Sequence, residues 1–380
     1  MFTPEIFVVA FEHLFVSWGI IAIAVGLTAG VVIGAVPGLT APMGVALVLP
    51  FTFFMDPVSA ILLLLGVYKG GIYGGSIPAI ILNTPGTVAA SATTLDGYQM
   101  TLSGQSKKAL DIALISSVLA DLVSTIMLIL FTGYLAKLAL HFGSPETFSL
   151  IFFSLLIVSS VSGDEITKGV IAALLGLLAA MVGVDSYYGT PRFIFGNVSM
   201  MNGFTILPLL VGFFAFSEVL FRLLSGKTES DLESVKRTMG ESLGASDIKR
   251  LLPTIFRSSL FGTILGAIPG IGAAPAAFFA YSEAKRRSKS PDQFGRGALE
   301  GVAAPEAANN AVCSASFIPV LSLGIPGGTA AAVIMGAFIM QGLAPGPYLF
   351  KENKDIILAI YLGLLCGSAF LFGLGQIAIK

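Results

Sequence analysis

The feature that most constrains this chain is a proline-glycine break inside an apolar stretch. Residues 74–87 read GGSIPAIILNTPGT. Pro85 has no N–H group and pushes Thr84 out of the α region, so a helix that arrives from Ser76 cannot continue through it. At membrane depth, the free backbone groups of such an end must be satisfied by protein or beside a polar cavity. The stretch therefore predicts a helix end that is buried in protein or lines a cavity.

The composition is that of a membrane protein. The chain has 380 residues, of which 55% are hydrophobic and 11% are charged. The charged fraction is less than half of the roughly 25% found in soluble domains. Several apolar runs reach about 20 residues, which is the length needed to cross a bilayer. We predict an all-α, polytopic (multi-pass) membrane protein. The net charge of −1 gives no indication of a nucleic-acid partner.

A second break of the same kind follows 241 positions after the first. Residues 317–328 read FIPVLSLGIPGG, with Pro326 in the place of Pro85. In addition, the string GAVPGL at residues 34–39 recurs as GAIPGI at residues 266–271. Two such anchors in the same order predict an internal duplication. Matched breaks in two halves are typical of the substrate site of a secondary transporter.

Glycines recur every four residues before each Pro-Gly motif. This spacing places them on one helix face, where they allow a neighbouring helix to approach closely. We predict a structural glycine ridge in each half, formed by Gly26, Gly30, Gly34 and Gly38 and by Gly262, Gly266 and Gly270.

A charged segment divides the chain. Residues 226–257 carry six basic and five acidic residues. We predict a first repeat with connecting transmembrane helices at 1–225, a polar cytoplasmic linker at 226–257 and a second repeat at 258–380. The linker and the loop at 285–296 are the most basic loops, which favours a cytoplasmic position for both. The first-half counterpart of 285–296 has no basic residue, and this asymmetry favours inverted repeats.

Apolar runs also predict individual helices. In the first half, two helical pieces are separated by the string KGG, and four long helices follow. The expected ranges are 58–68 and 72–82, and then about 110–140, 147–162, 166–183 and 203–225.

The free helix ends at the two breaks are candidates for a binding site. Half-helix N-termini offer N–H groups and positive dipole to an anion, while unwound carbonyls suit a sodium ion. The alternative is a kinked helix that packs tightly on its neighbours. The candidate substrate-binding residues are Asn83, Thr84, Gly86 and Thr87 at the first break, Gly324, Gly327 and Gly328 at the second, and Asn309 and Asn310.

Polar residues inside apolar helices are candidates for ion coupling. A helix is predicted to begin at Pro305, with Glu306, Asn309, Asn310 and Cys313 on one face. Glu306 could instead cap the helix, and the asparagines could hold helices together. Lys69 either pairs with a carboxylate or extends to the membrane interface. Asp121 is a proton-carrier candidate or an interhelical hydrogen-bonding group. The ion-coupling candidates are Ser76, Asn83, Glu306 and Asp121.

The sequence lacks the common enzyme signatures. His13 and His141 are isolated, and no HExxH, GxSxG or Walker motif is present. We therefore predict that the protein is not an enzyme. No cofactor is predicted apart from a coupling sodium ion or proton, and no metal apart from sodium.

Several strings together resemble a known family. In chain order they resemble the large membrane subunit of the tripartite tricarboxylate transporters, the TctA family. The motifs extend from about Gly26 to Phe350. The string PEAANN is the most specific of them. The strings are GAVPGL (34–39), YGGSI (73–77), LNTPGT (82–87), DGY (96–98), EGVAAPEAANNA (300–311), LGIPG (323–327) and GLAPGP (342–347).

The resemblance implies a permease of the bacterial inner membrane that imports citrate-like or other carboxylates, driven by a sodium or proton gradient. It implies two protein partners, a small membrane subunit (TctB-like) and a periplasmic solute-binding protein (TctC-like). It also implies an inverted-repeat secondary transporter with paired broken-helix hairpins of the elevator type. Family members are longer at the C-terminus, so the second repeat is expected to be truncated there. The alternative is a non-transporting membrane scaffold or receptor subunit of such a system.

Overall fold

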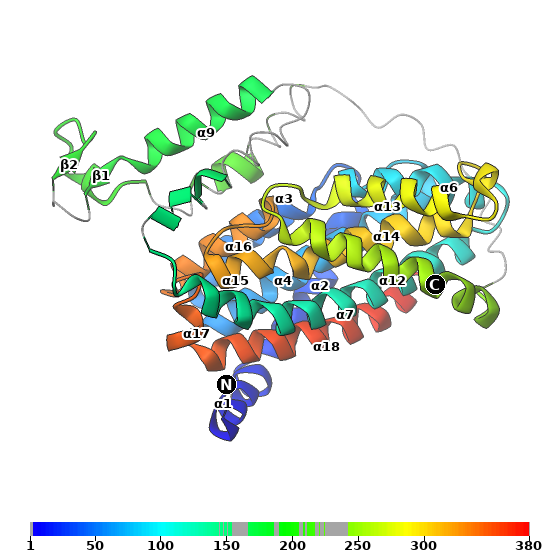
Figure 1. Cartoon of the computed structure of the whole chain (residues 1–380), viewed down its shortest axis with the longest axis horizontal. Coiled ribbons are helices and arrows are strands. Elements are labelled where there is room, and N and C mark those ends of the chain that lie inside the picture. The colour runs from blue at the N-terminus through cyan, green and yellow to red at the C-terminus, as the bar shows by residue number, and fades with distance from the viewer. Residues whose placement is uncertain are drawn as a thin grey trace.

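The computed structural model describes most of the chain. The described residues are 3–143 and 242–379, and between them 145–146, 148–149, 151–153, 166–185, 190–204, 208–209, 211–216, 220 and 224. They are mainly helical, with one two-stranded sheet. Figure 1 shows the long helices gathered in one bundle, with the α9 region set apart from it.

The first half alternates long helices with short helical pieces. Its elements are α1 (Pro4–Phe15), α2 (Gly19–Ala35), α3 (Ala41–Val48), the 3-10 helix η1 (Leu49–Phe54), α4 (Pro57–Gly74), α5 (Ser76–Leu82), the 3-10 helix η2 (Val88–Ala90), α6 (Ser91–Leu102) and α7 (Ser106–Ala139).

The second half of the bundle also alternates long helices with short helical pieces. Its elements are α12 (Ala245–Ala267), α13 (Ala273–Arg287), the 3-10 helix η5 (Pro291–Gln293), α14 (Leu299–Ala315), α15 (Phe317–Leu323), α16 (Thr329–Met340), α17 (Leu349–Glu352) and α18 (Lys354–Ala378).

The elements between the two halves are shorter. Strands β1 (Gly183–Val184) and β2 (Pro191–Arg192) pair in antiparallel fashion, with Gly183 opposite Arg192. The other elements there are α9 (Ile166–Ala180), the 3-10 helix η3 (Val198–Asn202) and the π-helix η4 (Val211–Phe216).

The predictions for this middle region are tested only in part. Helix α9 matches the helix predicted at 166–183. Most of the helix predicted at 147–162 and part of the one predicted at 203–225 lie outside the described residues. So do residues 226–241 of the predicted linker, while its last part, from Ala245 on, belongs to helix α12.

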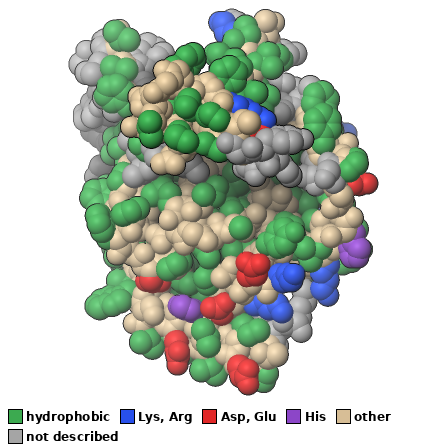
Figure 2. Space-filling model, turned by 90° about the vertical axis from the view of Figure 1, so that its left-hand side faces the viewer, with side chains coloured by type: hydrophobic (Ala, Val, Ile, Leu, Met, Phe, Trp, Pro, Cys, Tyr) green, Lys and Arg blue, Asp and Glu red, His purple; other side chains and the backbone are tan. Residues whose placement is uncertain are grey.

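Helices that are long and apolar enough to cross a membrane are present, as the composition predicts. Within the described ranges they are Pro57–Leu82 (α4 and α5 together), Ser106–Ala139 and Lys354–Ala378. The pair α1 and α2, bent by 49°, adds a fourth if it forms one span. Large apolar side chains such as Phe7 and Phe131 are exposed, and hydrophobic side chains cover much of the face in Figure 2. Such a surface suits contact with lipid.

Glycine allows helix α2 to pack directly on the backbone of α4. A Cβ atom at Gly30 would lie 2.4 Å from the carbonyl oxygen of Val67, and one at Gly34 would lie 2.2 Å from that of Gly71. In the second half, a Cβ atom at Gly262 of α12 would lie 2.3 Å from the carbonyl oxygen of Ala308 in α14. Real side chains do not fit at these distances, so glycine is required for the observed helix approach.

The last glycine of each predicted ridge lies in a turn and not in the helix. Gly38 and Gly270 lie beyond the ends of α2 and α12, with φ of 84° and 88°. Both therefore adopt the left-handed turn conformation that favours glycine.

The two breaks have matching backbone geometry. After α5, the N–H of Gly86 donates to the carbonyl of Gly75 (3.1 Å), and after α15 the N–H of Gly327 donates to the carbonyl of Ser316 (3.3 Å). Each pair is separated from its counterpart by the same 241 positions that separate the two prolines. The chain thus folds back on the start of the short helix in the same way in both halves.

Two predicted helix boundaries are wrong. Helix α4 is continuous through Lys69, Gly70 and Gly71, because Gly70 packs on α2 and Gly71 on Ala41 of α3. The axis is interrupted only at Gly75, between α4 and α5. Helix α14 begins at Leu299, so Pro305 lies inside the helix and does not start it.

The two halves pack across each other. Helix α7 of the first half lies against α14, and α18 of the second half lies against α4. The helices α4 and α14 are therefore each packed between a long helix of their own half, α2 or α12, and one of the opposite half, α18 or α7. This arrangement brings polar residues of both halves together near the breaks.

Candidate functional site

A cavity of about 700 Å³ lies beside the two breaks. Its wall is formed by the turns that follow the Pro-Gly motifs and the segments that follow the breaks, with Phe213 of η4 nearby. Among the described residues, none of the lining side chains is charged. The lining residues used below are Thr40, Tyr68, Thr87, Gly272, Gly328 and Thr329.

Three helices begin at this cavity, and two of them have glycine as the N-cap residue. Helix α3 is capped by Thr40, whose side chain accepts a hydrogen bond from the N–H of Met43 (3.4 Å). Helices α13 and α16 begin after Gly272 and Gly328, which offer no side chain to accept from the first turn. The first N–H groups of a helix have no partner within the helix and carry its positive dipole. The cavity can therefore hold an anion at the ends of α13 and α16.

The first break contributes one of its predicted residues to the cavity. Thr87 lines the wall, and its hydroxyl oxygen accepts a hydrogen bond from the N–H of Ala90 (3.3 Å). Gly86 is buried, and its N–H forms the hydrogen bond that folds the chain back onto Gly75; this turn is called the fold-back. Asn83 and Thr84 are exposed and do not line the cavity. Asn83 ends helix α5 in the left-handed conformation, with φ of 55°, a position that asparagine tolerates.

The second break is arranged in the same way. Gly328 lines the cavity, and Gly327 is buried in the fold-back to Ser316. Gly324 ends helix α15 with φ of 70°, as Asn83 does in the first half. Of the residues predicted at the two breaks, the structure thus brings Thr87 and Gly328 to the cavity.

The turns after the two Pro-Gly motifs line the cavity, but they were not among the predicted site residues. Thr40 and Gly272 occupy equivalent places, each three residues after a proline, Pro37 or Pro269. The repeated motif was visible in the sequence, but only its role in helix packing was inferred. That the residues after it begin a helix at the cavity depends on how α3 and α13 turn back in the fold.

Glu306 forms a second polar site, within the protein interior. Its side chain has 0% exposure. Thr93 of α6 donates to Oε1 (2.5 Å), while Ser76 of α5 (2.6 Å) and Ser117 of α7 (3.3 Å) donate to Oε2. Three first-half elements thus supply hydroxyl groups to a carboxylate of the second half. Ser76 and Glu306, predicted separately as ion-coupling candidates, are in direct contact.

The two asparagines of α14 differ in their surroundings. The Nδ2 group of Asn310 donates to the hydroxyl of Ser117 (2.8 Å) and to the carbonyl of Glu306 (3.0 Å). Asn309 is fully buried, and neither polar atom of its side chain has a partner in the described part of the chain. Neither asparagine lines the cavity. Asn310 therefore belongs to the Glu306 site.

Asp121 forms a buried ion pair with Lys69. Their Oδ2 and Nζ atoms are 2.8 Å apart, and each side chain is 2% exposed. Lys69 also donates to the carbonyl of Leu364 (3.2 Å), and the hydroxyls of Ser368 (2.6 Å) and Ser314 (3.3 Å) donate to Asp121. The predicted carboxylate partner of Lys69 exists and is Asp121, on α7.

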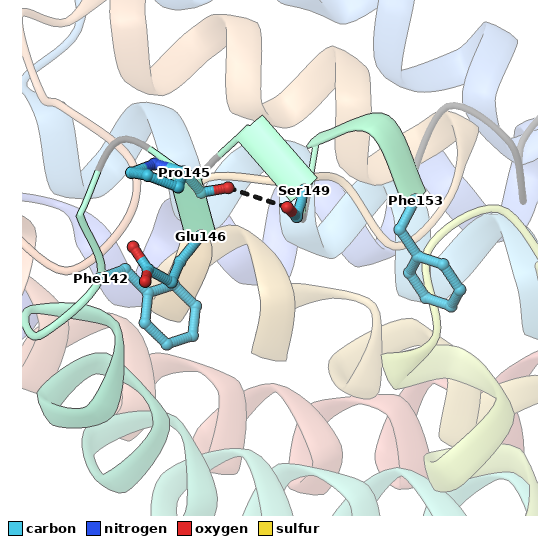
Figure 3. A pocket seen from close by; sticks show the side chains of 5 residues that line it. All are labelled: Phe142, Pro145, Glu146, Ser149 and Phe153. Carbon is cyan, nitrogen blue, oxygen red and sulfur yellow. Dashed lines mark hydrogen bonds between the residues drawn. The ribbon is translucent and has the colours of Figure 1, made fainter.

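A surface hollow lies near the end of α7. Figure 3 shows it lined by Phe142, Pro145, Glu146, Ser149 and Phe153. Its polar groups bond locally, since Glu146 accepts from the N–H of Gly143 (2.8 Å) and Ser149 donates to the carbonyl of Pro145 (2.8 Å).

Comparison with known proteins gives a family match over almost the whole chain. The sequence model described as "Tripartite tricarboxylate transporter TctA family" matches residues 20–380. A similar protein is an uncharacterised 52.8 kDa protein in the TAR-I ttuC' 3' region of Agrobacterium vitis, 38% identical over 361 residues, which cover 95% of this chain and 72% of the relative. Another, from the TAR-II ttuC' 3' region of the same organism, is 46% identical over 110 residues, 29% of this chain and 46% of the relative. No solved structure matches the chain.

Proposed function

This chain belongs to the tripartite tricarboxylate transporter TctA family, and we propose that it is the permease subunit of such a system. In this proposal it imports tricarboxylates or related carboxylates across the bacterial inner membrane, driven by a sodium or proton gradient. It acts with a small membrane subunit (TctB-like) and a periplasmic solute-binding protein (TctC-like). The family is one of transporters and not of enzymes.

The observation that carries the proposal is the pair of glycine-capped helix ends at the cavity. Helices α13 and α16 present first-turn N–H groups with no side-chain cap at Gly272 and Gly328. A carboxylate can accept several such N–H groups and is favoured by the positive helix end. A cavity of about 700 Å³ is within the range of small-molecule sites, roughly 300–1,000 Å³. The hydroxyls of Thr40, Tyr68 and Thr87 can bond further oxygens of the substrate.

The absence of lysine and arginine from the described lining fits a transported substrate. Release of the substrate from a buried ion pair would leave the lysine or arginine charge without a partner, and this cost would slow release. Backbone N–H groups and partial helix charges bind more weakly, so the substrate can enter from one side and leave to the other. The proposed site therefore replaces Asn83 and Thr84 with Thr87, Gly328 and the turn at Gly272 as the main substrate contacts.

Movement of the broken helices provides the proposed transport step. The fold-backs at Gly75 and Ser316 give both halves a short helix held by few backbone bonds at its base. We propose that the halves are inverted repeats that move together with the substrate in an elevator-type mechanism. The crossed packing of α7 on α14 and of α18 on α4 supports a common moving unit. Ion coupling is assigned to the polar site of Glu306 and Ser76.

A binding and uptake experiment tests the proposal, with citrate as the tricarboxylate probe. Calorimetry on the purified chain measures binding, and vesicles that carry the chain with both partner subunits measure uptake. Binding together with gradient-dependent uptake is expected. Binding without uptake under any gradient would instead support a non-transporting receptor subunit. Absence of binding for citrate and for shorter carboxylates would contradict the cavity as a carboxylate site.

A further inference from the structure

We propose that Glu306 is a proton-binding site. The hydroxyl groups of Ser76, Thr93 and Ser117 form a cage around its carboxylate, and this cage transmits the protonation state to the wall of the cavity. This deepens the proposed function, on which it rests, by naming the proton as the coupling ion. A hydronium ion of the solvent gives its proton to one carboxylate oxygen of Glu306 and leaves a water molecule, and the side chain changes from negative to neutral. No other group is consumed or formed.

The first argument is that the carboxylate is buried without a cation. Glu306 has 0% exposure, and no ion pair involves it in the part of the chain that the structure describes. The buried lysine Lys69 does not pair with Glu306, because its Nζ atom is bonded to Asp121 and to the carbonyl of Leu364. An isolated buried carboxylate is costly, and such a group commonly takes up a proton instead.

The second argument is that the cage is closed around the carboxylate. Thr93 and Ser76 lie 2.5 Å and 2.6 Å from its two oxygens. These are the distances of direct, strong O–H···O hydrogen bonds. Oxygen atoms that share a sodium ion are held apart by that ion, so a sodium site here would require the cage to open. The observed geometry accommodates a proton without movement of the helices.

The third argument is that hydroxyl groups can serve both protonation states. A serine or threonine hydroxyl donates to a carboxylate, and it can rotate to accept from a protonated carboxyl group. The hydroxyl of Ser117 already accepts from Asn310 (2.8 Å), which leaves its own hydrogen for Glu306. Ser76 and Thr93 are therefore the groups that can turn when the proton binds.

The other titratable groups around Glu306 have different partners. On the neighbouring helices, Asp96 is bonded to Tyr281, Asp111 to Lys107 and Asp121 to Lys69. Tyr73 of α4 is buried, and its hydroxyl has no hydrogen-bond partner among the described residues. Helix α5 contributes no titratable side chain. Among the buried carboxylates in the described ranges, Glu306 is thus the one that has neither a cation nor a tyrosine bonded to it.

Only a few residues connect Ser76 with the wall of the cavity. Ser76 follows Gly75, and the carbonyl of Gly75 accepts the N–H of Gly86 (3.1 Å). A Cβ atom at Gly75 would lie 2.8 Å from the side chain of Thr87, so these groups are in tight contact. Thr87 lines the cavity. The hydrogen bond between Ser76 and Glu306, which changes when the proton binds, therefore lies one residue from the fold-back that positions a proposed substrate contact.

Infrared spectroscopy of the purified full chain in lipid nanodiscs tests the proposal without any transport. A protonated carboxyl group gives a C=O stretching band that shifts in deuterated water. We expect a band that disappears as the pH rises, is absent in Glu306→Gln, and is retained in Glu300→Gln, a variant of the same helix. In Ser76→Ala the band should move to higher frequency because one hydrogen bond is lost.

Sodium and folding are controlled in the same measurement. The spectra are recorded in sodium chloride and in choline chloride, and we expect the band in both. A band that sodium removes would overturn the proposal in favour of a sodium site, and so would a band unchanged in Glu306→Gln. If that variant does not fold, the absence of a shift in Ser76→Ala would overturn it. Failure of citrate uptake with the band intact would count against the proposed function only.

Discussion

The hydroxyl of Ser76 lies 2.6 Å from the carboxylate of Glu306, although 230 positions separate them in the chain. Ser76 begins the short helix of the first break, and Glu306 lies in the broken helix of the second half. The contact connects a polar site in the interior with the backbone that forms the cavity. It also explains why a carboxylate in an apolar helix is compatible with folding, since its oxygens are bonded by groups from three other elements.

The glycine cap of α16 offers a direct test of the carboxylate site. Gly328 has an extended backbone, and a Cβ atom there would meet nothing within 4 Å, so larger residues fit. We expect Gly328→Asp to weaken citrate binding by about 100-fold or more, because a fixed charge at the helix end repels the substrate carboxylate. Calorimetry measures the affinity.

The matched controls for this change are Gly328→Ala and Gly328→Asn. Alanine should bind citrate nearly as well as glycine, and asparagine should show a smaller loss than aspartate because it caps without charge. The aspartate variant should be folded, since N-cap residues stabilise helices by about 1 kcal/mol. Equal affinity for the aspartate and asparagine variants would rule out an electrostatic role for this helix end.

The buried pair of Lys69 and Asp121 should be essential as a pair. Lys69→Met leaves an unpaired carboxylate in the interior, and we expect it to reduce the free energy of unfolding by about 3–5 kcal/mol. The double variant Lys69→Met, Asp121→Leu should recover much of this loss, because no charge remains. Denaturation in detergent measures both. A single variant as stable as the unchanged protein would contradict the buried ion pair.

The contact of α2 with α4 should not tolerate a methyl group. Gly30→Ala places a Cβ atom 2.4 Å from the carbonyl oxygen of Val67, and we expect a loss of about 1–3 kcal/mol in unfolding free energy from the forced separation. Gly373→Ala on α18 is the matched control, since nothing lies within 4 Å there. That change should stabilise the helix by about 0.5–1 kcal/mol. Similar effects of both variants would refute the close approach.

Asp96 should hold the loop between α13 and α14 in place. Its Oδ1 atom accepts from the N–H groups of Gly295 (2.9 Å), Gly297 (2.8 Å) and Ala298 (2.7 Å). We expect Asp96→Ala to speed hydrogen exchange at these amides by about tenfold or more, since bonds to a charged acceptor contribute about 1.5–3 kcal/mol each. Exchange mass spectrometry measures this.

The control for the loop is Tyr281→Phe, which removes the single hydroxyl bond to Oδ2 of Asp96 (2.9 Å) and leaves the three N–H bonds. Its exchange should change much less than that of the alanine variant. If the loop amides exchange at the same rate in Asp96→Ala and in the unchanged protein, the carboxylate does not fix the loop.

The main features of the fold could be predicted because they depend on local chemistry. Apolar runs of sufficient length predict membrane helices, and Pro85 and Pro326 predict where two of them end. The boundary at Pro305 could not be predicted from proline alone, since a helix can pass through proline when the surrounding packing holds it. The continuity of α4 through Gly70 depends likewise on its contact with α2.

The sequence predicted the region of the candidate site correctly, but it did not predict which residues of that region line the cavity. Thr87 and Gly328 line the cavity, whereas Asn83 and Thr84 are exposed at the end of α5. The sequence shows polar residues beside a break, but it does not show which side of the fold-back each one occupies. That is decided by the direction in which the chain leaves the left-handed residue at the helix end.

The sequence by itself determined the membrane class and the two breaks, since each follows from composition or from the covalent structure of proline. Only the tertiary structure decided that Lys69 pairs with Asp121 and that Ser76 bonds Glu306. The physical reason is that these contacts join different helices. Their rotation and crossing are fixed by packing over the whole bundle, through glycine contacts far from the polar groups. The same packing places the uncapped ends of α13 and α16 at one cavity.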